Sequence, residues 1–513
     1  MRALTSTRII HLVTIALALT ASACGGGGGG STPNVPGPTN TPGGPPPNTS
    51  SPSPGASITP SPSPTHSNAP TPTPSPVHTN SPTPMPTSTT TTGTTILPDT
   101  TGRFGLIQIL DDYGRNNAQL TTSQIQSEAP NYDSVWGTFF PSTWSAAHPG
   151  MILSRYYMPF EDNSLVSGNN LNYFLTNHPD WILYGCDNNN NPTADYAFSG
   201  TGFPNDVPLD IHNPAVVQYQ MQTILAYLAA NGYNALAVDN VVFENFLTSP
   251  NPRLEPGKTT NPGWYGCGIY TSGPANPSSF VRRYNGPLDN LNDANFNADV
   301  NNWIAQARAT LGPHGIKVLV NHPPHSSAPS SDELTMLSHI DGMVDENGYT
   351  HYGTLLNTNA FANTLNWVEY LQGHNIAALI TDYFCTGSSC SNDPSTLTAQ
   401  QADWALASYA IGNNGGENVY ISPHGGAIYS YRSEYSRRYG AACGSYTPVS
   451  SFVYERRFQG GLAIVNATSG TPYSLALPAG HNYSDIEGRP VTNPLIVNPT
   501  DAYMLLTSGN GCS

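Results

Sequence analysis

Charged side chains are scarce in this sequence. Only 10% of its 513 residues are Asp, Glu, Lys or Arg, whereas about 25% is usual in soluble domains. Most of the charges are acidic, and the formal net charge is −16 at pH 7. A chain with so little Lys and Arg is poorly suited to bind nucleic acid or an anionic membrane surface. We therefore expect no nucleic-acid partner and favour a neutral polymer as the ligand.

Several common catalytic signatures are also missing. The sequence has no Gly-x-Ser-x-Gly elbow, phosphate-binding loop, His-Glu-x-x-His motif or dinucleotide fingerprint. Asp187 and Asp195 flank an Asn-rich stretch with oxygen ligands suitable for Ca²⁺, but the stretch lacks the glycine of a calcium loop. Prolines separate His322 from His325, which disfavours a metal site there. We predict no metal and no organic cofactor.

The N-terminus resembles a bacterial lipoprotein signal peptide. Arg2 and Arg8 precede the apolar run Ile9–Leu19, which is too short to span a bilayer comfortably. The small residues Ala21–Ala23 lead to Cys24, although Ala21 stands where Leu is usual. We predict that residues 1–24 are the signal peptide and that Cys24 is lipidated, with ordinary secretion as the alternative. The predicted location is the bacterial cell surface, with membrane contact only through this anchor.

Residues 25–99 have the composition of a linker. A run of six glycines is followed by a long stretch rich in Pro, Ser and Thr. Such a stretch cannot bury enough apolar surface to offset its chain entropy, so we predict a disordered linker. The six cysteines after it are an even number, which suggests disulfides in an exported protein. Cys385 and Cys390 are close enough to form one small loop, and the other pairings stay open.

Eight apolar runs of strand length follow the linker. Their continuous hydrophobicity indicates strands buried on both faces, as in parallel sheets. Helix signals lie between several of them, such as Asn213-Pro214 before one helix and Gly232 after it. We predict a monomeric α/β protein with a (β/α)8 TIM barrel over residues 100–445. The runs are 103–114, 151–159, 181–187, 234–241, 316–323, 341–349, 376–384 and 418–426.

Residues 446–513 change character, with short strands and turn residues but no helix signal. We predict a C-terminal all-β sandwich that packs one face inward and stabilises the barrel.

Acidic and imidazole groups recur where the predicted barrel strands end. In TIM barrels the chemistry sits at the carboxyl ends of the strands, so these side chains should converge at one mouth. Two carboxyl groups facing each other across a glycosidic bond can hydrolyse it. The predicted catalytic residues are Asp239, Glu346 and Asp382. The predicted substrate-binding residues are Asp111, Asp112, Tyr113, Arg155, Asp187, Asn240, Asn321, His322, Tyr349, Tyr383 and His424.

The stretch "GYNALAVDNV", the acid-ended sixth and seventh runs, and the terminal "YERRFQGGLAIVN", "YSDIEGRPV" and "AYMLL" resemble putative glycoside-hydrolase-like barrels. The hypothetical glycosyl hydrolase family fifteen is closest, and the endo-α-1,4-polygalactosaminidases are more distant. The resemblance implies a (β/α)8 barrel, a C-terminal β-domain and a polysaccharide substrate. By position, it implies that Asp239 and Glu346 are the acids of the fourth and sixth strands. Asn321 stands where the amylase pattern has Glu.

Alternative interpretations remain for several of the predicted site residues and for the function. Asp239 could be a structural residue that caps its loop. Asp345 and Glu346 are adjacent and should face opposite ways, and we favour Glu346 as the catalytic one. Arg155 should pair with one of the acids. The main functional alternative to a hydrolase is a surface-tethered carbohydrate-binding lipoprotein without catalytic activity.

Overall fold

A computed structural model describes most of the chain after residue 104. The described residues are 105–109, 120–187, 191–197, 206–243, 266–285, 293–322, 327–346, 348–351, 354–384, 397–413, 419–424, 432–437 and 439–513. Cys24, the linker, Asp111, Asp112, Tyr113, and the Cys385 and Cys390 pair lie outside these residues.

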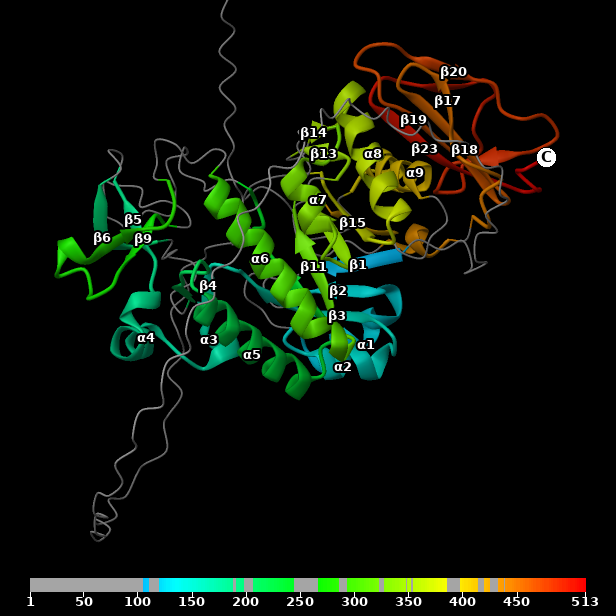
Figure 1. Cartoon of the computed structure of the whole chain (residues 1–513). Helices are drawn as coiled ribbons and strands as arrows, with labels where there is room; N and C mark the ends of the chain where they lie inside the picture. The colour runs from blue at the N-terminus through cyan, green and yellow to red at the C-terminus, as the bar shows by residue number, and fades with distance from the viewer. Residues whose placement is uncertain are drawn as a thin grey trace, which may run out of the picture. The chain divides into compact units, whose positions relative to one another are not determined.

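Eight parallel strands close into a barrel, as predicted (Figure 1). Each strand pairs with the next barrel strand along the chain, and the last pairs with the first. The strands are β1 (Gly105–Ile109), β2 (Ser134–Trp136), β3 (Ile152–Tyr157), β8 (Ala235–Val238), β11 (Lys317–Asn321), β12 (Gly342–Asp345), β15 (Ala377–Tyr383) and β16 (Val419–His424).

The identity of one barrel strand differs from the prediction. The run 181–187 was expected in the barrel, but its strand β5 (Tyr184–Cys186) pairs antiparallel with two other strands in a separate sheet. The missing barrel strand is β2, which is only three residues long. Three residues make too short a run to recognise, because hydrophobic patterns need more positions. The total of eight was therefore right although one member was wrong.

Helices follow most of the barrel strands. The Asn213 side chain caps α5, and Gly232 ends it in the left-handed conformation with φ 79°, as the sequence indicates. After β16 a short 3-10 helix, Ser433–Ser436, takes the place of the eighth helix. The helices between barrel strands are α1 (Thr122–Glu128), α2 (Pro141–Ala147), α5 (Pro214–Asn231), α6 (Ala294–Leu311), α7 (Ser331–Leu337), α8 (Thr358–Gly373) and α9 (Ala399–Gly412).

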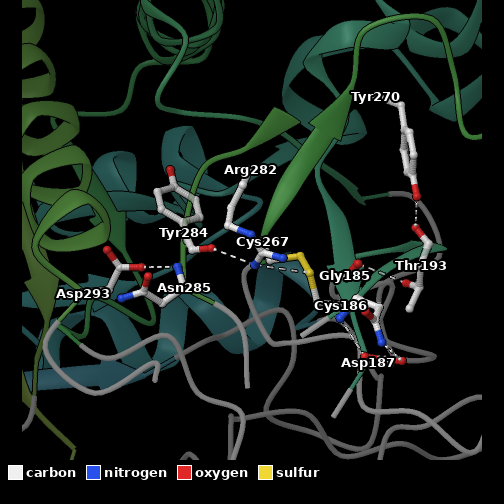
Figure 2. The surroundings of a disulfide bond; sticks show 11 residues. Gly185, Cys186, Asp187, Thr193, Cys267, Tyr270, Arg282, Tyr284, Asn285 and Asp293 are labelled. Carbon is white, nitrogen blue, oxygen red and sulfur yellow. Dashed lines mark hydrogen bonds between the residues drawn. A yellow bond between two sulfur atoms is a disulfide. The ribbon is translucent and has the colours of Figure 1, made fainter. Parts of the chain in front are cut away.

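Two excursions from the barrel build a second sheet. Its strand order is β10-β9-β5-β6, with strands from both excursions side by side. A disulfide between Cys186 and Cys267 joins β5 to the residue before β9 (Figure 2). The excursions contain β4 (Glu161–Asn163), α3 (Ser164–Ser167), α4 (Leu171–Asn177), β5, β6 (Pro192–Tyr196), β7 (Asp206–Pro208), β9 (Gly268–Tyr270) and β10 (Phe280–Arg282).

The C-terminal residues form a five-stranded antiparallel sheet of order β17-β18-β19-β23-β21, beside a two-stranded sheet of β20 and β22. A second disulfide joins Cys443 to Cys512. The strands are β17 (Thr447–Ser450), β18 (Val453–Phe458), β19 (Gly461–Asn466), β20 (Tyr473–Leu475), β21 (Tyr483–Ser484), β22 (Leu495–Val497) and β23 (Asp501–Thr507).

Both faces of strand β19 are buried, so the prediction of one inward face is wrong there. Leu462 and Ile464 pack in a cluster with residues of β20 and β22. Ala463 and Val465 point the other way and belong to the cluster that includes the barrel core. The strand therefore appears in the sequence as a continuous apolar run, which is typical of burial on both faces.

Polar contacts join this sheet to α9. The buried Arg456 of β18 donates to the carbonyls of Ala410 and Ile411 at 3.2 and 3.3 Å, and also to that of Asn413. These carbonyls lie at the end of the helix, where backbone acceptors have no partner within the helix. The N–H of Met504 donates to the Asp403 carboxyl at 2.9 Å.

Among the described residues, none of the helices combines the length and apolarity needed to cross a membrane.

Candidate active site

The contacts of Tyr157 show which face of the barrel sheet is the inner one. Its ring stacks on Trp303 of α6 with centroids 6.1 Å apart, so it faces the helices. Its neighbour Tyr156 must then face the barrel interior, because successive strand residues alternate. Register places Ala237 of β8 and Leu319 of β11 on the same inner face as Tyr156.

Asp239 lies on the inner face at the carboxyl end of β8. It stands two residues after Ala237 and is 4% exposed. The Tyr156 hydroxyl donates to Oδ2 at 2.5 Å, and the Asn321 amide donates to Oδ1 at 2.7 Å. Donors on both oxygens fix the orientation of the carboxyl group.

Asn240 turns the chain directly after Asp239. Its φ of 56° lies in the left-handed region, which Asn adopts more readily than most residues. Its amide nitrogen is 3.4 Å from Oδ2 of Asp239 and 3.0 Å from the sulfur of Met158. Asn240 is thus a neighbour of the Asp239 carboxylate, and its predicted role in substrate binding stays a prediction.

The acids after β12 divide between the two faces of the sheet. Gly342 pairs with Leu319, so Gly342 and Val344 face inward and Asp345 faces outward. Glu346 is the first residue after the strand, and alternation continued by one position would bring it to the inner side. Glu346 is partly exposed, whereas Asp345 is 4% exposed.

Strand β15 adds two inner residues to this end of the barrel. Ala377 pairs with the inner residue Gly342, so Thr381 and Tyr383 share its face. Tyr383 is partly exposed. The hydroxyl of Thr381 and Oδ1 of Asn321 are buried and have no hydrogen-bond partner among the described residues. Buried polar atoms of this kind are uncommon in native proteins.

Asp382 and Tyr349 lie on the opposite face. Asp382 alternates with Thr381 and Tyr383, and it accepts the N–H of Tyr349 at 2.7 Å. Burial, with a smaller contribution from the nearby Asp345 carboxylate, raises the pKa of Asp382 to about 7 against the effect of the Tyr349 donor. Tyr349 is fully buried and packs on Phe361 of α8 at 4.9 Å. The structure does not bring these two residues together with Asp239.

His322 also faces outward. Its Nδ1 is 2.8 Å from the carbonyl of Val241, and its Nε2 is 2.9 Å from the Glu333 carboxylate of α7. Burial raises the pKa of Glu333, but the hydrogen bonds from His322 and Ser330 outweigh it and hold the pKa near 2. His322 therefore joins the loop after β8 to α7.

Arg155 is buried on the outer face of β3. Its guanidinium lies 4.3 Å from the ring centre of Phe139 and 5.8 Å from that of Tyr227 in α5. These contacts are cation–π interactions with the helix layer. The structure thus places Arg155 away from the inner face that carries Asp239, and its predicted acidic partner stays a prediction.

Two further predicted residues lie apart from this group or are described only by backbone. Asp187 belongs to the excursion sheet, where it accepts the Asn191 N–H at 2.7 Å and the Asn191 amide at 3.1 Å. His424 ends β16 opposite Tyr383 in the register, and its side chain lies outside the described ones.

Tyr156 and Thr381 were missed by the sequence analysis. Tyr156 stands in "SRYYMP" beside an equally plausible Tyr157, and only the parity of the strand separates them. Tyr156 and Asp239 are far apart in the sequence, so no local pattern indicates the hydrogen bond between them. If Arg155 had been taken as an outward residue, strand alternation would have placed the next residue, Tyr156, inward.

Comparisons with known proteins give likenesses in solved structures alone. No family model matches the chain, and no curated protein matches it. A maltogenic α-amylase from Thermotoga neapolitana is 11% identical over 80% of this chain and 97% of its own, with a TM-score of 0.39. Aspergillus fumigatus Ega3, in complex with galactosamine, is 12% identical over 65% and 96%, with a TM-score of 0.32.

An α-L-fucosidase from Paenibacillus thiaminolyticus is 11% identical over 62% of this chain and 45% of its own, with a TM-score of 0.35. The chain is similar to these glycoside-hydrolase-like barrels. At such low TM-scores the fold assignment rests on the closed eight-stranded register and not on the likeness.

Proposed function

We propose that this protein is a glycoside hydrolase that acts on an extracellular polysaccharide or oligosaccharide. The observation that carries the proposal is the inner-face carboxylate of Asp239, held by Tyr156 and Asn321 at the carboxyl ends of three neighbouring strands. Asp239 acts as the nucleophile or the base, and Glu346 acts as the acid/base. This division of roles between two carboxyl groups is the one that glycoside hydrolysis uses.

The environment of the two acids supports these roles. Asp239 is buried and accepts side-chain hydrogen bonds on both oxygens, which hold its carboxyl group in a fixed orientation. Glu346 is partly exposed and can exchange protons with solvent between turnovers. Tyr383, on the same inner face, is partly exposed and is suited to pack on a sugar ring.

The test is the release of reducing ends from a panel of neutral and amino-sugar polysaccharides. Wild type is compared with Asp239→Asn and Glu346→Gln, and Asp180→Asn is the matched control because Asp180 lies in a 3-10 helix of the excursion. We expect hydrolysis by wild type and the control and none by the two site variants, with circular dichroism unchanged. Binding without turnover by all four proteins would favour the carbohydrate-binding alternative.

We also propose that the protein is exported and anchored through a lipid on Cys24. Two disulfides support a location outside the reducing cytoplasm. Fractionation of the expressing bacterium should find wild type with the membrane and Cys24→Ser in the soluble fraction. Recovery of both proteins in the soluble fraction would favour ordinary secretion.

A further inference from the structure

The backbone of residues after Glu346 is bound by side chains on the outer face of the barrel sheet. The N–H of Gly348 donates to Oδ1 of Asp345 at 3.0 Å, and the N–H of Tyr349 donates to Oδ1 of Asp382 at 2.7 Å. Both carboxyls lie on the outer face of the barrel. Two outward acids of neighbouring strands thus receive the backbone donors of Gly348 and Tyr349, the second and third residues after the proposed acid/base.

The helices hold the same residues from the other side. Thr364 of α8 donates its hydroxyl to the carbonyl of Gly348 at 3.2 Å. Trp404 of α9 donates its indole N–H to the carbonyl of Tyr349 at 3.1 Å. We call Gly348–Thr350 the clamped segment, because its backbone has partners in both the sheet and the helix layer.

The clamp leaves no spare room at Gly348. A Cβ on this residue would lie 2.6 Å from Oδ1 of Asp382, 2.7 Å from Cγ2 of Ile380 and 2.9 Å from the carbonyl oxygen of Thr381. Its φ of 51° is also left-handed. A side chain there would have to push the clamped segment away from β15.

Among the described residues, Asp382 has no charged partner that would explain its burial as part of an ion pair. It is 1% exposed, and its Oδ2 has no hydrogen-bond partner among the described residues. The titratable groups that act on it or feel its charge are the acid Asp345 and the buried hydroxyls of Tyr349 and Tyr435. Burying an acid without a charged partner costs folding free energy. This cost suggests that Asp382 is kept for a function.

We propose that Asp382 is a positioning residue, which holds the clamped segment against β15 and thereby presents Glu346 to the inner end of the barrel. The proposal rests on the function proposed above for Glu346. Its mechanism is indirect, since Asp382 touches the backbone of Tyr349 and faces away from Asp239. Small displacements of an acid/base are costly, because a misplacement of about 1 Å can lower the rate about 10²-fold.

Two substitutions separate the backbone contact from the charge. Asp382→Asn keeps an oxygen that accepts the Tyr349 N–H, while Asp382→Leu removes the acceptor and keeps the branched arrangement of heavy atoms. Gly348→Ala displaces the clamped segment by another route and serves if the Leu variant does not fold. The first readout is hydrogen exchange of the full chain, followed at the Gly348 and Tyr349 amides. We expect protection in wild type and Asp382→Asn, and its loss in Asp382→Leu and Gly348→Ala.

The second readout is kcat/KM on two substrates, the polysaccharide that wild type hydrolyses and a dinitrophenyl glycoside of the same sugar. The dinitrophenyl group leaves without a proton and therefore does not need Glu346 as an acid. We expect Asp382→Leu and Gly348→Ala to lose about 10–100-fold on the polysaccharide and to lose much less on the dinitrophenyl glycoside. Asp382→Asn should stay within about threefold of wild type on both, because its backbone contact is intact.

Three results would overturn the proposal. Asp382→Asn could lose activity on both substrates with protection intact, which would place Asp382 in direct contact with the reaction. Asp382→Leu could keep full activity, or it could lose both substrates equally while its amides stay protected. If wild type hydrolyses nothing, the proposed function fails, and unchanged protection in Asp382→Leu would then reject the clamp separately.

Discussion

Asp239 and Asp382 lie at the carboxyl ends of two strands of one barrel, β8 and β15, but are held in different ways. Asp239 faces inward and receives side-chain donors on both oxygens. Asp382 faces outward, receives one backbone donor, and has a pKa raised by burial to about 7. Donors aimed at both oxygens suit a carboxylate that must carry charge, whereas a single backbone contact suits a group that fixes the chain.

Asp403 in α9 repeats the outward pattern at the junction with the C-terminal sheet. It too is buried and accepts a backbone N–H, that of Met504. Acids near strand and helix ends are therefore not equivalent in this protein, and those on the inner face are the candidates for chemistry. The predictions below test this difference.

The largest expected effect is on activity at Asp239. Asp239→Asn should lower kcat/KM by at least about 10³-fold, because the nucleophile or base is removed. The midpoint of urea unfolding should change little. The measurement is hydrolysis of the identified substrate at fixed pH, beside Asp180→Asn. Residual activity above a tenth of wild type would remove Asp239 from the reaction.

The second effect is on stability at Arg456. Arg456→Met should lower the free energy of unfolding by about 3 kcal/mol, because the carbonyls at the end of α9 lose a charged donor. Urea unfolding measures the change. The neighbouring Arg457→Met is the control, since Arg457 is 43% exposed and pairs with Glu455 at the surface. Equal effects of both changes would show that the buried hydrogen bonds of Arg456 add no stability beyond that of a surface arginine.

The third effect is the pH dependence of stability at Asp403. Burial raises the pKa of Asp403 from 3.8 to about 8, with Asp485, Asp501 and Glu487 raising it further. The folded protein thus binds the proton more tightly, so this stability is present below about pH 4 and is lost as the pH rises through 8.

Asp403→Asn removes that titration while keeping an acceptor for Met504. It should raise the free energy of unfolding at pH 8 by about 2 kcal/mol relative to wild type. The advantage should shrink as the pH falls towards 4. Unfolding curves at pH 4, 6 and 8 measure it, and a constant difference at all three values would contradict the raised pKa.

The smallest effect is on activity at Tyr156. Tyr156→Phe removes one donor to the Asp239 carboxylate and should lower kcat/KM about 10-fold, since a hydrogen bond to a charged group contributes roughly 1.5–3 kcal/mol. Tyr157→Phe is the matched control on the outer face, where the ring keeps its stacking on Trp303. Its activity should stay at the wild-type level, and equal losses would contradict the assignment of faces.

Much of the barrel could be predicted from the sequence. Long buried strands such as β15 give continuous apolar runs, and their ends position acids that can be named in advance. The three-residue strand β2 gave no such run, and β5 imitated a barrel strand because an antiparallel sheet buried by aromatic neighbours has a similar composition.

The candidate site was predictable only in part. Asp239 follows small inward residues that mark its strand. Glu346 was preferred to Asp345 because its side chain is longer and it precedes Asn-Gly. Asp382, His322 and Tyr349 were placed with them because they stand where predicted strands end. A shift of one residue along a strand, however, moves a side chain from the inner to the outer face of the barrel. The partnership of Tyr156 with Asp239 joins residues 83 positions apart, and a local pattern cannot reveal it.

The most direct test of the central claim is chemical rescue by azide. Asp239→Gly and Asp382→Gly are assayed on a dinitrophenyl glycoside of the released sugar, with and without sodium azide. We predict that azide restores turnover in Asp239→Gly and forms a glycosyl azide, because the small anion takes the place of the lost carboxylate or its activated water. Asp382→Gly should form none. Rescue of Asp382→Gly, or no glycosyl azide from Asp239→Gly, would contradict the account.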